Sequence, residues 1–548
     1  MSTVAMAAMF GQAFAAEVTV VSAARIHTMD VAHPQVQAMA YDDTGKLLAL
    51  GDTDALLKAY PNATRIDAGK ATIVPGLIDA HGHIPGLGIA MMAADLVDTR
   101  DKAEIMARLR EYAARLPKDA WIVGRGWDQN DWPEKVFPSA ADLDAVFPDR
   151  PVWLERIDGH AGWANTAALR AVKRDLSGDW QPDGGRIDRD ANKQPTGILI
   201  DAAMLLVEDA RPPLDETTGE RALTIAMQSA VEHGLTGVHD AGITLAEFRR
   251  YQRLADRGAM PLRVTAMAGG DGDALELLCR DGLYKHASGR LQMRSVKLYA
   301  DGALGSRGAA MLADYSDDHG NRGLELMSPE AMNAAVDKAK RCGVQAATHA
   351  IGDRGNRNTL DAYQRALGNG ASGDHRWRIE HAQVLAPEDL PRLAQLHVIA
   401  SMQPTHATSD MPWAEDRVGP ARIVGAYAWR QLRDSGARLA LGSDFPVESV
   451  DPRLGLSAAA TRADAQGLPI GGWYPNEKLT AFEALRGFTL DAAFAGFAEN
   501  EVGSLEVGKR ADFVVFEEDP LAISPAALRD LTVDATYVDG KPVFERKK

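Results

Sequence analysis

The chain contains 548 residues, of which 46% are hydrophobic and 25% are charged. This length exceeds that of one ordinary domain and fits a large barrel with an accessory domain. The formal net charge of -16 argues against a nucleic-acid partner, because phosphate binding needs a positive surface. The only cysteines are Cys279 and Cys342, which excludes a thiolate zinc cluster, and excludes a disulfide framework as the main source of stability. Any metal must therefore be held by nitrogen and oxygen ligands.

The N-terminal residues have the character of an export signal. Residues 4–16 are small and apolar, and Ala13, Phe14 and Ala15 form the small-x-small pattern of a signal-peptidase site. We interpret residues 1–16 as the remnant of a signal peptide, which predicts a periplasmic or secreted protein. No Lys or Arg precedes the apolar run, so a disordered N-terminus on a cytoplasmic enzyme stays open as the alternative. No other apolar run in the sequence is long enough to span a membrane.

Short alternating segments at the two chain ends predict β-strands. Turn residues separate these segments, as expected of antiparallel strands, and Asp539-Gly540 is a typical hairpin turn. We therefore expect one small β-sandwich domain built from residues 17–73 and 499–548, which keeps the termini close together. The predicted strands cover residues 18–21, 37–40 and 47–50 at one end, and 513–516, 535–538 and 541–544 at the other.

Between these ends, residues 74–498 alternate short apolar strands with helical segments, the pattern of a parallel α/β fold. There are eight such strands, and all but the one over residues 262–267 end in a polar residue, counting Tyr299. Eight strands close a (β/α)8 barrel of the TIM type. Active sites of such barrels lie at the carboxyl ends of the strands, so we expect the site there. The predicted strands cover residues 77–81, 235–239, 262–267, 296–299, 344–349, 377–381, 398–403 and 439–444.

One long interval does not fit a bare barrel. Well over a hundred residues, rich in Trp and Gly, separate the first predicted barrel strand from the second. An insertion of this size with strand signals of its own is not a plain loop. We predict a large insertion subdomain over about residues 100–230, which covers the barrel mouth and helps to form the substrate pocket.

The strongest motif is Asp79-Ala80-His81-Gly82-His83, at the end of the first barrel strand. Residues two apart on a strand point the same way, so both imidazoles can reach one metal ion. The plain alternative is a pair of polar residues at a strand end, because His-x-His often occurs by chance. Its position at the end of an apolar strand that opens a barrel favours metal binding.

Lys297 lies in the middle of a strand among apolar neighbours, where an unpaired ammonium is costly. An ammonium also has no lone pair to give to a metal. Two interpretations follow from the residues alone. Lys297 is a structural residue paired with Asp301 or another carboxylate, or its neutral amine has captured carbon dioxide to form a carbamate that bridges two cations.

Three more potential metal ligands end barrel strands, namely His349, His381 and Asp444. A lone histidine at a strand end is more often a structural hydrogen-bonding residue, and Asp444 also fits an Asx turn that leads into Pro446. Two histidines on successive strands, added to the His-x-His pair, favour a metal site.

Together these motifs resemble those of amidohydrolase family 3, a group of the amidohydrolase superfamily that includes enzymes similar to N-substituted formamide deformylase. The resemblance covers nearly the whole chain, and its motifs are specific for the family but not for a substrate. The matching segments are residues 75–83, 296–307, 348–353, 379–381 and 442–446.

The resemblance implies a binuclear site with two divalent metal ions, and zinc suits nitrogen and oxygen ligands. Lys297 matches the superfamily position of an N6-carboxylated lysine that bridges both ions. The other implied ligands are His81, His83 and Asp444 for the more buried ion, and His349 and His381 for the second ion.

The resemblance further implies a metal-dependent hydrolase that cleaves a C–N bond other than a peptide bond in a small molecule. Its substrate would be an amide, an N-acyl amine or an N-formyl amine. Two ions about 3.5–4 Å apart would lower the pKa of a shared water, giving a metal-bridging hydroxide. Asp444 is the predicted catalytic proton shuttle from this nucleophile to the leaving amine.

Two other functions stay open. The same binuclear site is suited to an ester, lactone, carbamate or cyclic amide, and a non-catalytic metal-bearing binding protein is the third hypothesis. The complete set of ligand types argues against the third. The partners we expect are the small-molecule substrate and a second copy of the chain, because a twofold homodimer is the commonest oligomer.

Four further residues are candidate substrate contacts. We expect His160 to hold the substrate carbonyl or its oxyanion, and His239 to line the site from the end of the second barrel strand. Arg307 would bind a substrate carboxylate, and Trp127 would supply an apolar wall. Each residue is equally consistent with a structural role, which for Trp is commonly core packing.

Overall fold

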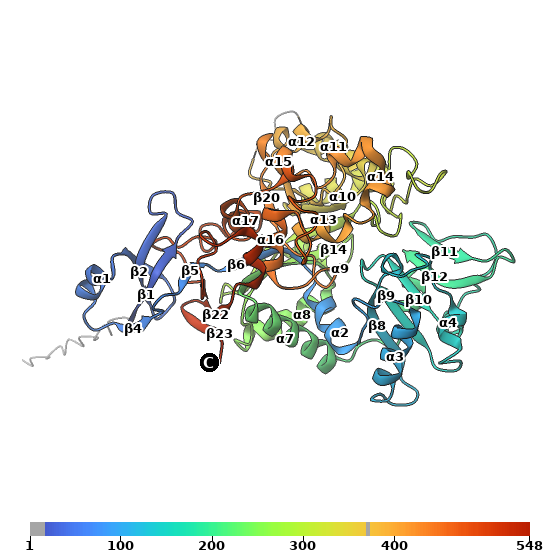
Figure 1. The fold of residues 1–548 in the computed structure, drawn as a ribbon, viewed down its shortest axis with the longest axis horizontal. Helices are drawn as coiled ribbons and strands as arrows, with labels where there is room; N and C mark the ends of the chain where they lie inside the picture. Colours follow the sequence, from blue (N-terminus) through green and yellow to red (C-terminus); the bar gives the residue numbers. More distant parts are fainter. Residues whose placement is uncertain (1–16, 369–372, 548) are drawn as a thin grey trace, which may run out of the picture.

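The computed structural model describes residues 17–368 and 373–547. The molecule has three bodies, with a sheet from both chain ends on one side, a barrel in the middle and an inserted sheet on the other side (Figure 1). The predicted signal peptide lies outside the described residues. Within the described ranges, no helix combines the length and the apolar character that crossing a bilayer requires.

The middle body is a barrel of eight parallel strands in the order β20-β19-β18-β17-β16-β14-β13-β6. Its two end strands meet where the Asp444 amide donates to the His81 carbonyl oxygen at 2.7 Å. All eight predicted strands are present, and the TIM-type barrel is confirmed. The strands are β6 (Leu77–Gly82), β13 (Leu235–Ile243), β14 (Arg263–Gly269), β16 (Leu291–Tyr299), β17 (Gln345–Ala350), β18 (Arg378–His381), β19 (Ile399–Met402) and β20 (Leu439–Leu441), with β15 (Tyr284–Lys285) paired to β16.

Helices cover the outside of the barrel, and local sequence sets where they begin. Helix α8 starts with a capping box, in which the Glu247 amide donates to Thr244 Oγ1 and the Thr244 amide donates to the Glu247 carboxylate. Its buried residues Phe248, Tyr251 and Leu254 recur at helical spacing, so one face packs on the barrel. The helices of this body are α2 (Ile84–Met92), α7 (Glu216–Glu232), α8 (Leu245–Asp256), α9 (Asp273–Asp281), α10 (Pro329–Arg341), α11 (Asp353–Leu367), α12 (Leu390–Gln395), α13 (Pro404–Asp410), α14 (Ala414–Arg422), α15 (Trp429–Asp434), α16 (Pro452–Thr461), α17 (Ala481–Gly487) and α18 (Leu490–Ala495).

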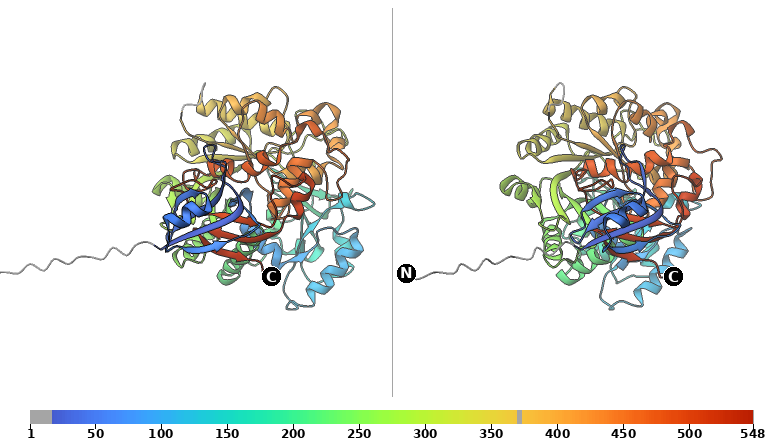
Figure 2. Two further views of the ribbon diagram at one scale, coloured as in Figure 1. Left: turned by 60° about the vertical axis from the view of Figure 1, so that its left-hand side comes forward. Right: turned by 90° about the vertical axis from the view of Figure 1, so that its left-hand side faces the viewer.

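The two chain ends build one sheet, in which the N-terminal strands (blue) lie beside the C-terminal strands (red) in Figure 2. Strand β5 pairs with β1 on one edge and with β21 on the other. The sequence predicted a sandwich of two sheets, but β5 joins all eight strands in one hydrogen-bonded sheet, so the sandwich is not confirmed. The predicted hairpin is present as β22 and β23. The strands are β1 (Val18–His27), β2 (Gln35–Asp42), β3 (Leu47–Gly51), β4 (Thr64–Asp67), β5 (Thr72–Pro75), β21 (Phe513–Phe516), β22 (Val533–Val538) and β23 (Lys541–Glu545), with α1 (Thr53–Ala59) after β3.

The insertion is a six-stranded sheet with its own core. The indoles of Trp127, Trp132 and Trp163 pack together, with ring centroids 5.9 to 6.4 Å apart. Each indole N–H donates to a backbone carbonyl, so burial leaves no polar atom of the three rings unpaired. Its elements include β7 (Ala94–Asp95), α3 (Lys102–Ala113), β8 (Ile122–Trp127), α4 (Ala140–Asp144), β9 (Val152–Arg156), β10 (Ala161–Ala164), α5 (Thr166–Ala171), β11 (Gly185–Arg189) and β12 (Pro195–Asp201).

The insertion ends earlier than the predicted range of about 100–230. Its last strand stops at Asp201, whereas α7 packs against α2 and β13. The buried Leu223 and Met227 of α7 belong to the barrel core. Helix α7 is therefore part of the barrel body, because its apolar face is covered there.

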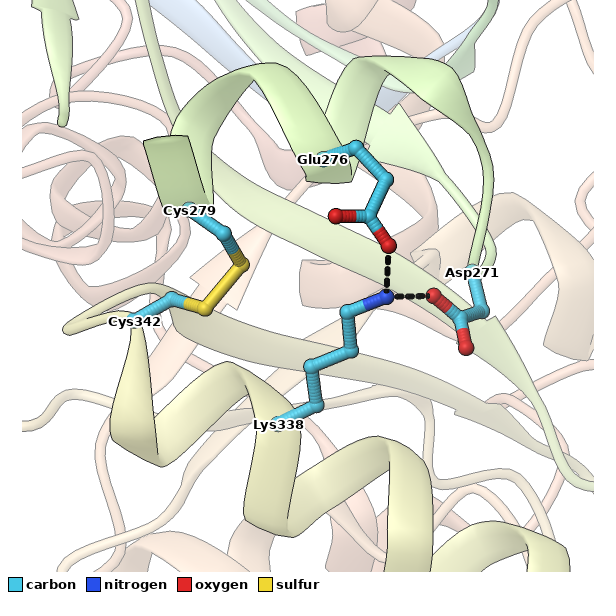
Figure 3. The surroundings of a disulfide bond; sticks show 5 residues. All are labelled: Asp271, Glu276, Cys279, Lys338 and Cys342. Carbon is cyan, nitrogen blue, oxygen red and sulfur yellow. Dashed lines mark hydrogen bonds and ion pairs between the residues drawn. A yellow bond between two sulfur atoms is a disulfide. The ribbon is translucent and has the colours of Figure 1, made fainter. Parts of the chain in front are cut away.

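Cys279 in α9 and Cys342 after α10 form a disulfide that joins two neighbouring outer helices of the barrel (Figure 3). On the same side, Lys338 of α10 pairs with Asp271 and Glu276. The sequence analysis excluded a disulfide framework and did not predict this single bond. Cysteines 63 residues apart meet only because two successive strand-helix units lie side by side.

Candidate metal centre

Six side chains of the predicted ligand types meet at the carboxyl ends of the barrel strands. His83 Nε2 lies 3.1 Å from Asp444 Oδ1, and His81 Nε2 lies 3.5 Å from the same oxygen. Lys297 Nζ lies 3.1 Å from His81 Nε2. The ring centroid of His381 is 4.9 Å from that of His81 and 4.6 Å from that of His349. The barrel thus brings the six residues together from five different strand ends: His81 and His83 (β6), Lys297 (β16), His349 (β17), His381 (β18) and Asp444 (after β20).

The ligand atoms form two groups that share Asp444. One group is His81, His83 and Asp444, as the family resemblance implied. The other consists of His381, His406 and Asp444. His349 lies next to His381 but turns its Nε2 toward the Gly302 carbonyl oxygen at 3.4 Å. The second group therefore contains a histidine that the sequence analysis did not name.

His406 was missed because it does not end a strand. It lies in α13, just beyond β19, and its ring stacks on that of His381 with centroids 5.8 Å apart. The predicted strand over residues 398–403, which corresponds to β19, ends in Gln403, and this residue is neither charged nor a histidine. A search for a ligand type in the turn after that strand would have found His406.

The residues present fit a bound cation. Asp444 Oδ1 and His406 Nε2 are buried and have no hydrogen-bond partner within residues 17–368 and 373–547. A buried polar atom without a partner is costly, and a divalent cation would coordinate both atoms. Imidazole nitrogens with a carboxylate oxygen are a ligand set that suits zinc and related ions.

Two of these positions have backbone conformations that are uncommon for residues other than glycine. The φ angles of His381 and Asp444 are 73° and 63°. Such left-handed conformations cost free energy and persist only where the surroundings hold them. Such conformations are common at functional sites, and here they occur at two of the candidate metal ligands.

A buried carboxylate orients one of the histidines. His81 Nδ1 donates to Glu380 Oε2, which leaves Nε2 with its lone pair toward Asp444 and Lys297. Arg378 Nε lies 2.7 Å from Glu380 Oε1, and its Nη2 donates to Ser401 Oγ at 2.7 Å. Burial opposes ionisation of Glu380, but Arg378 and His81 hold the pKa of this carboxyl well below its ordinary value. The sequence analysis assigned no role to Glu380 or Arg378.

The surroundings of Lys297 bear on both interpretations of this residue. Asp301, its predicted structural partner, accepts three backbone N–H groups instead. Burial lowers the pKa of Lys297 to about 8, against the opposing attraction of Asp444 and Glu380. A fraction of the side chain is therefore a neutral amine near neutral pH, and this is the form that reacts with carbon dioxide.

All the predicted ligands except His81 line a cavity of about 1550 Å³ between the barrel loops and the insertion. His83, Lys297 and Asp444 line it from the barrel, and Arg156 and His160 line it from the insertion. The insertion therefore forms one wall of the pocket, as the sequence predicted. A cavity of this size is ample for a small-molecule substrate.

His160 is the one weaker candidate that the structure brings to the cavity. Its Nδ1 lies 2.6 Å from Asp201 Oδ1, and its ring centroid is 5.2 Å from that of His349. Burial disfavours its charged form, but the hydrogen bond and charge of Asp201 raise the pKa of His160 to about 9. At neutral pH the ring is protonated, which leaves its Nε2–H as a donor.

The other three candidates do not line the cavity. His239 is buried and accepts a hydrogen bond from Arg378 at 2.9 Å. Arg307 pairs with Asp317. Trp127 is buried in the insertion core, where its ring packs against other indoles. The contacts of these three side chains are therefore with other parts of the protein and not with the cavity.

A TIM-type barrel with histidine, lysine and carboxylate side chains at its strand ends defines the class of metal-dependent hydrolases. The model of the Amidohydrolase family matches residues 64–544 of the chain. The chain therefore belongs to the amidohydrolase family and is a hydrolase.

Individual relatives agree with this assignment. A Bacillus subtilis protein named as the amidohydrolase YtcJ is 33% identical over 530 residues, 95% of this chain and 98% of that protein. N-substituted formamide deformylase of Arthrobacter pascens is 30% identical over 542 residues, 95% of this chain and 97% of that enzyme. The crystal structure of an uncharacterized metal-dependent hydrolase from Pyrococcus horikoshii has a TM-score of 0.76 at 26% identity, covering 93% of this chain and 99% of that chain.

Proposed function

We propose that the protein hydrolyses a C–N bond other than a peptide bond in a small molecule, such as an N-acyl or N-formyl amine. The observation that carries this proposal is the buried Asp444 Oδ1, which lies 3.1 and 3.5 Å from the Nε2 atoms of His83 and His81 and has no hydrogen-bond partner among the residues that the structure describes. Similarity to N-substituted formamide deformylase over 95% of the chain supports an N-formyl amine as the first substrate to test.

The site is suited to two divalent ions, with zinc the best match to its ligands. His81, His83 and Asp444 would hold one ion, and His381 with His349 or His406 the other. Lys297 would be N6-carboxylated, in which Nζ bonds to the carbon of carbon dioxide and releases one proton to solvent. When bound, the ions polarise the substrate carbonyl and lower the pKa of water.

The protein side chains then move the protons. Burial opposes the ionised form of Asp444, but His83 and His81 hold its pKa well below the ordinary value, so the free group is a carboxylate whose oxygens are open to a proton donor. It takes the proton of the attacking water and delivers it to the amine nitrogen as the C–N bond breaks. His160 donates from Nε2 to the carbonyl oxygen, since Asp201 accepts at Nδ1.

A substrate panel tests the reaction class. The zinc-loaded enzyme is assayed on an N-formyl amine, an N-acetyl amine, an ester, a lactone, a carbamate and a cyclic amide. Turnover of the N-formyl or N-acetyl amine above the other compounds supports the proposal. Faster turnover of the ester or lactone than of the two amides would favour the alternative hypothesis of ester or lactone hydrolysis. If none of the six compounds is hydrolysed, the proposed reaction class is contradicted.

Metal content tests the bridged site. Elemental analysis of wild type grown with zinc should give about two ions per chain, with a clear loss in Lys297→Ala. Lys338→Ala is the matched control, because Lys338 lies on the outside of the barrel with Asp271 and Glu276. One ion in both wild type and Lys297→Ala would make Lys297 structural.

We also propose that the enzyme works in the periplasm or outside the cell. The Cys279–Cys342 disulfide supports this location, because such bonds persist mainly in oxidising compartments. Fractionation of the producing cells tests it, and recovery in the cytoplasmic fraction would contradict it. The homodimer stays a prediction, for which light scattering gives the molar mass.

A further inference from the structure

The acidic side chains that line the cavity differ in whether an arginine neutralises them. On the insertion wall, Asp128 and Asp158 both pair with Arg156. Glu155 of the same wall pairs with Arg125. Each of these acidic side chains therefore has an arginine of its own chain beside it.

The barrel wall has two acidic side chains without such a partner. Asp410, at the end of α13, and Glu448, after β20, line the cavity. Asp410 accepts only from neutral donors, Gln383 Nε2 at 2.8 Å and the Tyr427 hydroxyl at 2.7 Å. Glu448 has the hydroxyl of Ser409 as its neighbour. Neither carboxyl forms an ion pair with any residue that the structure describes.

Both groups are in an unfavourable electrostatic position. Burial raises the pKa of Glu448 to about 8, and repulsion from Asp410 and Asp444 adds to this effect. Burial likewise raises the pKa of Asp410 to about 7. A cation placed beside them would offset the repulsion and favour the ionised forms.

A separate observation points to a ligand at this wall. Thr405 lies on the same helix as Asp410, lines the cavity and is 8% exposed. Its buried Oγ1 has no hydrogen-bond partner within the described ranges. A buried hydroxyl of this kind normally has a partner, so the cavity offers an acceptor that a substrate donor is able to use.

We propose that the substrate carries an ammonium or guanidinium group, which binds at the barrel wall formed by Asp410, Glu448 and Thr405 while the scissile carbonyl lies at the metal ligands. The inference rests on the proposed function, since it names the substrate class of the same site. A charged donor supplies several N–H groups and forms stronger hydrogen bonds with carboxylates than a neutral donor does.

Turnover of two matched substrates tests the wall. N-formylcadaverine carries a terminal ammonium where N-hexylformamide carries a methyl group. We expect a higher kcat/KM for N-formylcadaverine in wild type, and a fall of about 10- to 100-fold on this substrate in Asp410→Asn and in Glu448→Gln. The loss should appear mainly in KM. Both variants should lose much less kcat/KM on N-hexylformamide than on N-formylcadaverine.

Asp98→Asn is the matched control. Asp98 also lines the cavity but is exposed on the insertion side, so its substitution changes the net charge of the cavity equally. It should leave both substrates unaffected. Equal kcat/KM for the two substrates in wild type would overturn the inference. If Asp98→Asn lowers kcat/KM on N-formylcadaverine as much as Glu448→Gln does, the inference is also overturned. The overall negative charge of the cavity would then explain the preference for the charged substrate.

A binding measurement separates failure of this inference from failure of the proposed function. Calorimetry with pentylguanidinium and pentanol on the zinc-loaded protein needs no turnover, and a guanidinium ion donates N–H hydrogen bonds but has no lone pair for a metal. Tighter binding of the cation, weakened about tenfold in Glu448→Gln, supports the cationic subsite even if neither formamide is hydrolysed. Equal binding of the cation by wild type and Glu448→Gln would overturn it even if both formamides are hydrolysed.

Discussion

The floor of the metal site and the core of the insertion are both fully buried but contain opposite kinds of side chain. Under the candidate metal ligands, the charged Arg378 and Glu380 are 0% exposed and pair with each other, and Glu380 also accepts from His81. In the insertion, Trp127 and Trp163 are equally buried but pack as apolar rings. Buried ion pairs add little net stability compared with apolar packing, whereas large aromatic side chains contribute strongly. The buried charges beneath the candidate ligands are therefore explained by the chemistry of the site, and the buried tryptophans of the insertion by its stability.

Substitution of the shared ligand should have the largest effect. Asp444→Asn keeps the shape of the side chain but removes the proton acceptor, so we expect kcat to fall about 10²- to 10⁴-fold. Steady-state kinetics on the best substrate of the panel measure the fall, and the melting temperature should stay near that of wild type. Activity retained in Asp444→Asn would contradict its role as proton shuttle.

Truncation in the insertion core should affect stability instead. Trp127→Ala removes a ring in contact with Trp132 and Trp163, and such substitutions lower the free energy of unfolding by about 3–5 kcal/mol. Urea unfolding measures this loss, which should be smaller in Trp127→Phe. The folded variant should keep the wild-type kcat. A fall in kcat without a fall in stability would break the contrast between the two regions.

Removal of the disulfide in the outer helix layer of the barrel should have an effect of intermediate size. Replacing both Cys279 and Cys342 by Ser removes a cross-link between residues 63 positions apart, which should lower the free energy of unfolding by about 2–4 kcal/mol. Denaturant unfolding of the double variant and of reduced wild type should give the same midpoint. An unchanged midpoint would mean that Lys338 and its partners hold α9 and α10 together without the disulfide.

The smallest effect is expected for substitution of Glu380, which lies beneath the candidate metal ligands. Glu380→Gln weakens the hold on His81, and loss of such a partner reduces metal affinity about 10- to 100-fold. Competition with a chelator measures the affinity. Glu388→Gln is the control, because Glu388 pairs with Arg357 on the surface. Unchanged affinity in Glu380→Gln would mean that packing alone orients the imidazole.

Much of this molecule could be predicted because the relevant signals are local. All eight barrel strands were visible as short apolar runs, and the ligands His81 and His381 were visible because they end such runs. The single terminal sheet was not predicted, since no strand was expected where β5 lies and only its two partners reveal that it joins both chain ends. His406 was missed because it lies one turn beyond a strand.

The sequence by itself determined the fold class, the number of barrel strands and the ligand types at their ends, because each depends on patterns within a few residues. Tertiary structure alone decided how those ligands are held and what faces them. His81 meets Glu380 across 299 residues, and Ser443 meets Asp79 across 364 residues. The same holds for the cavity, where a carboxylate is neutralised or left without a cation according to its neighbours in space. Such contacts follow from barrel closure and the docking of the insertion, so no local pattern encodes them.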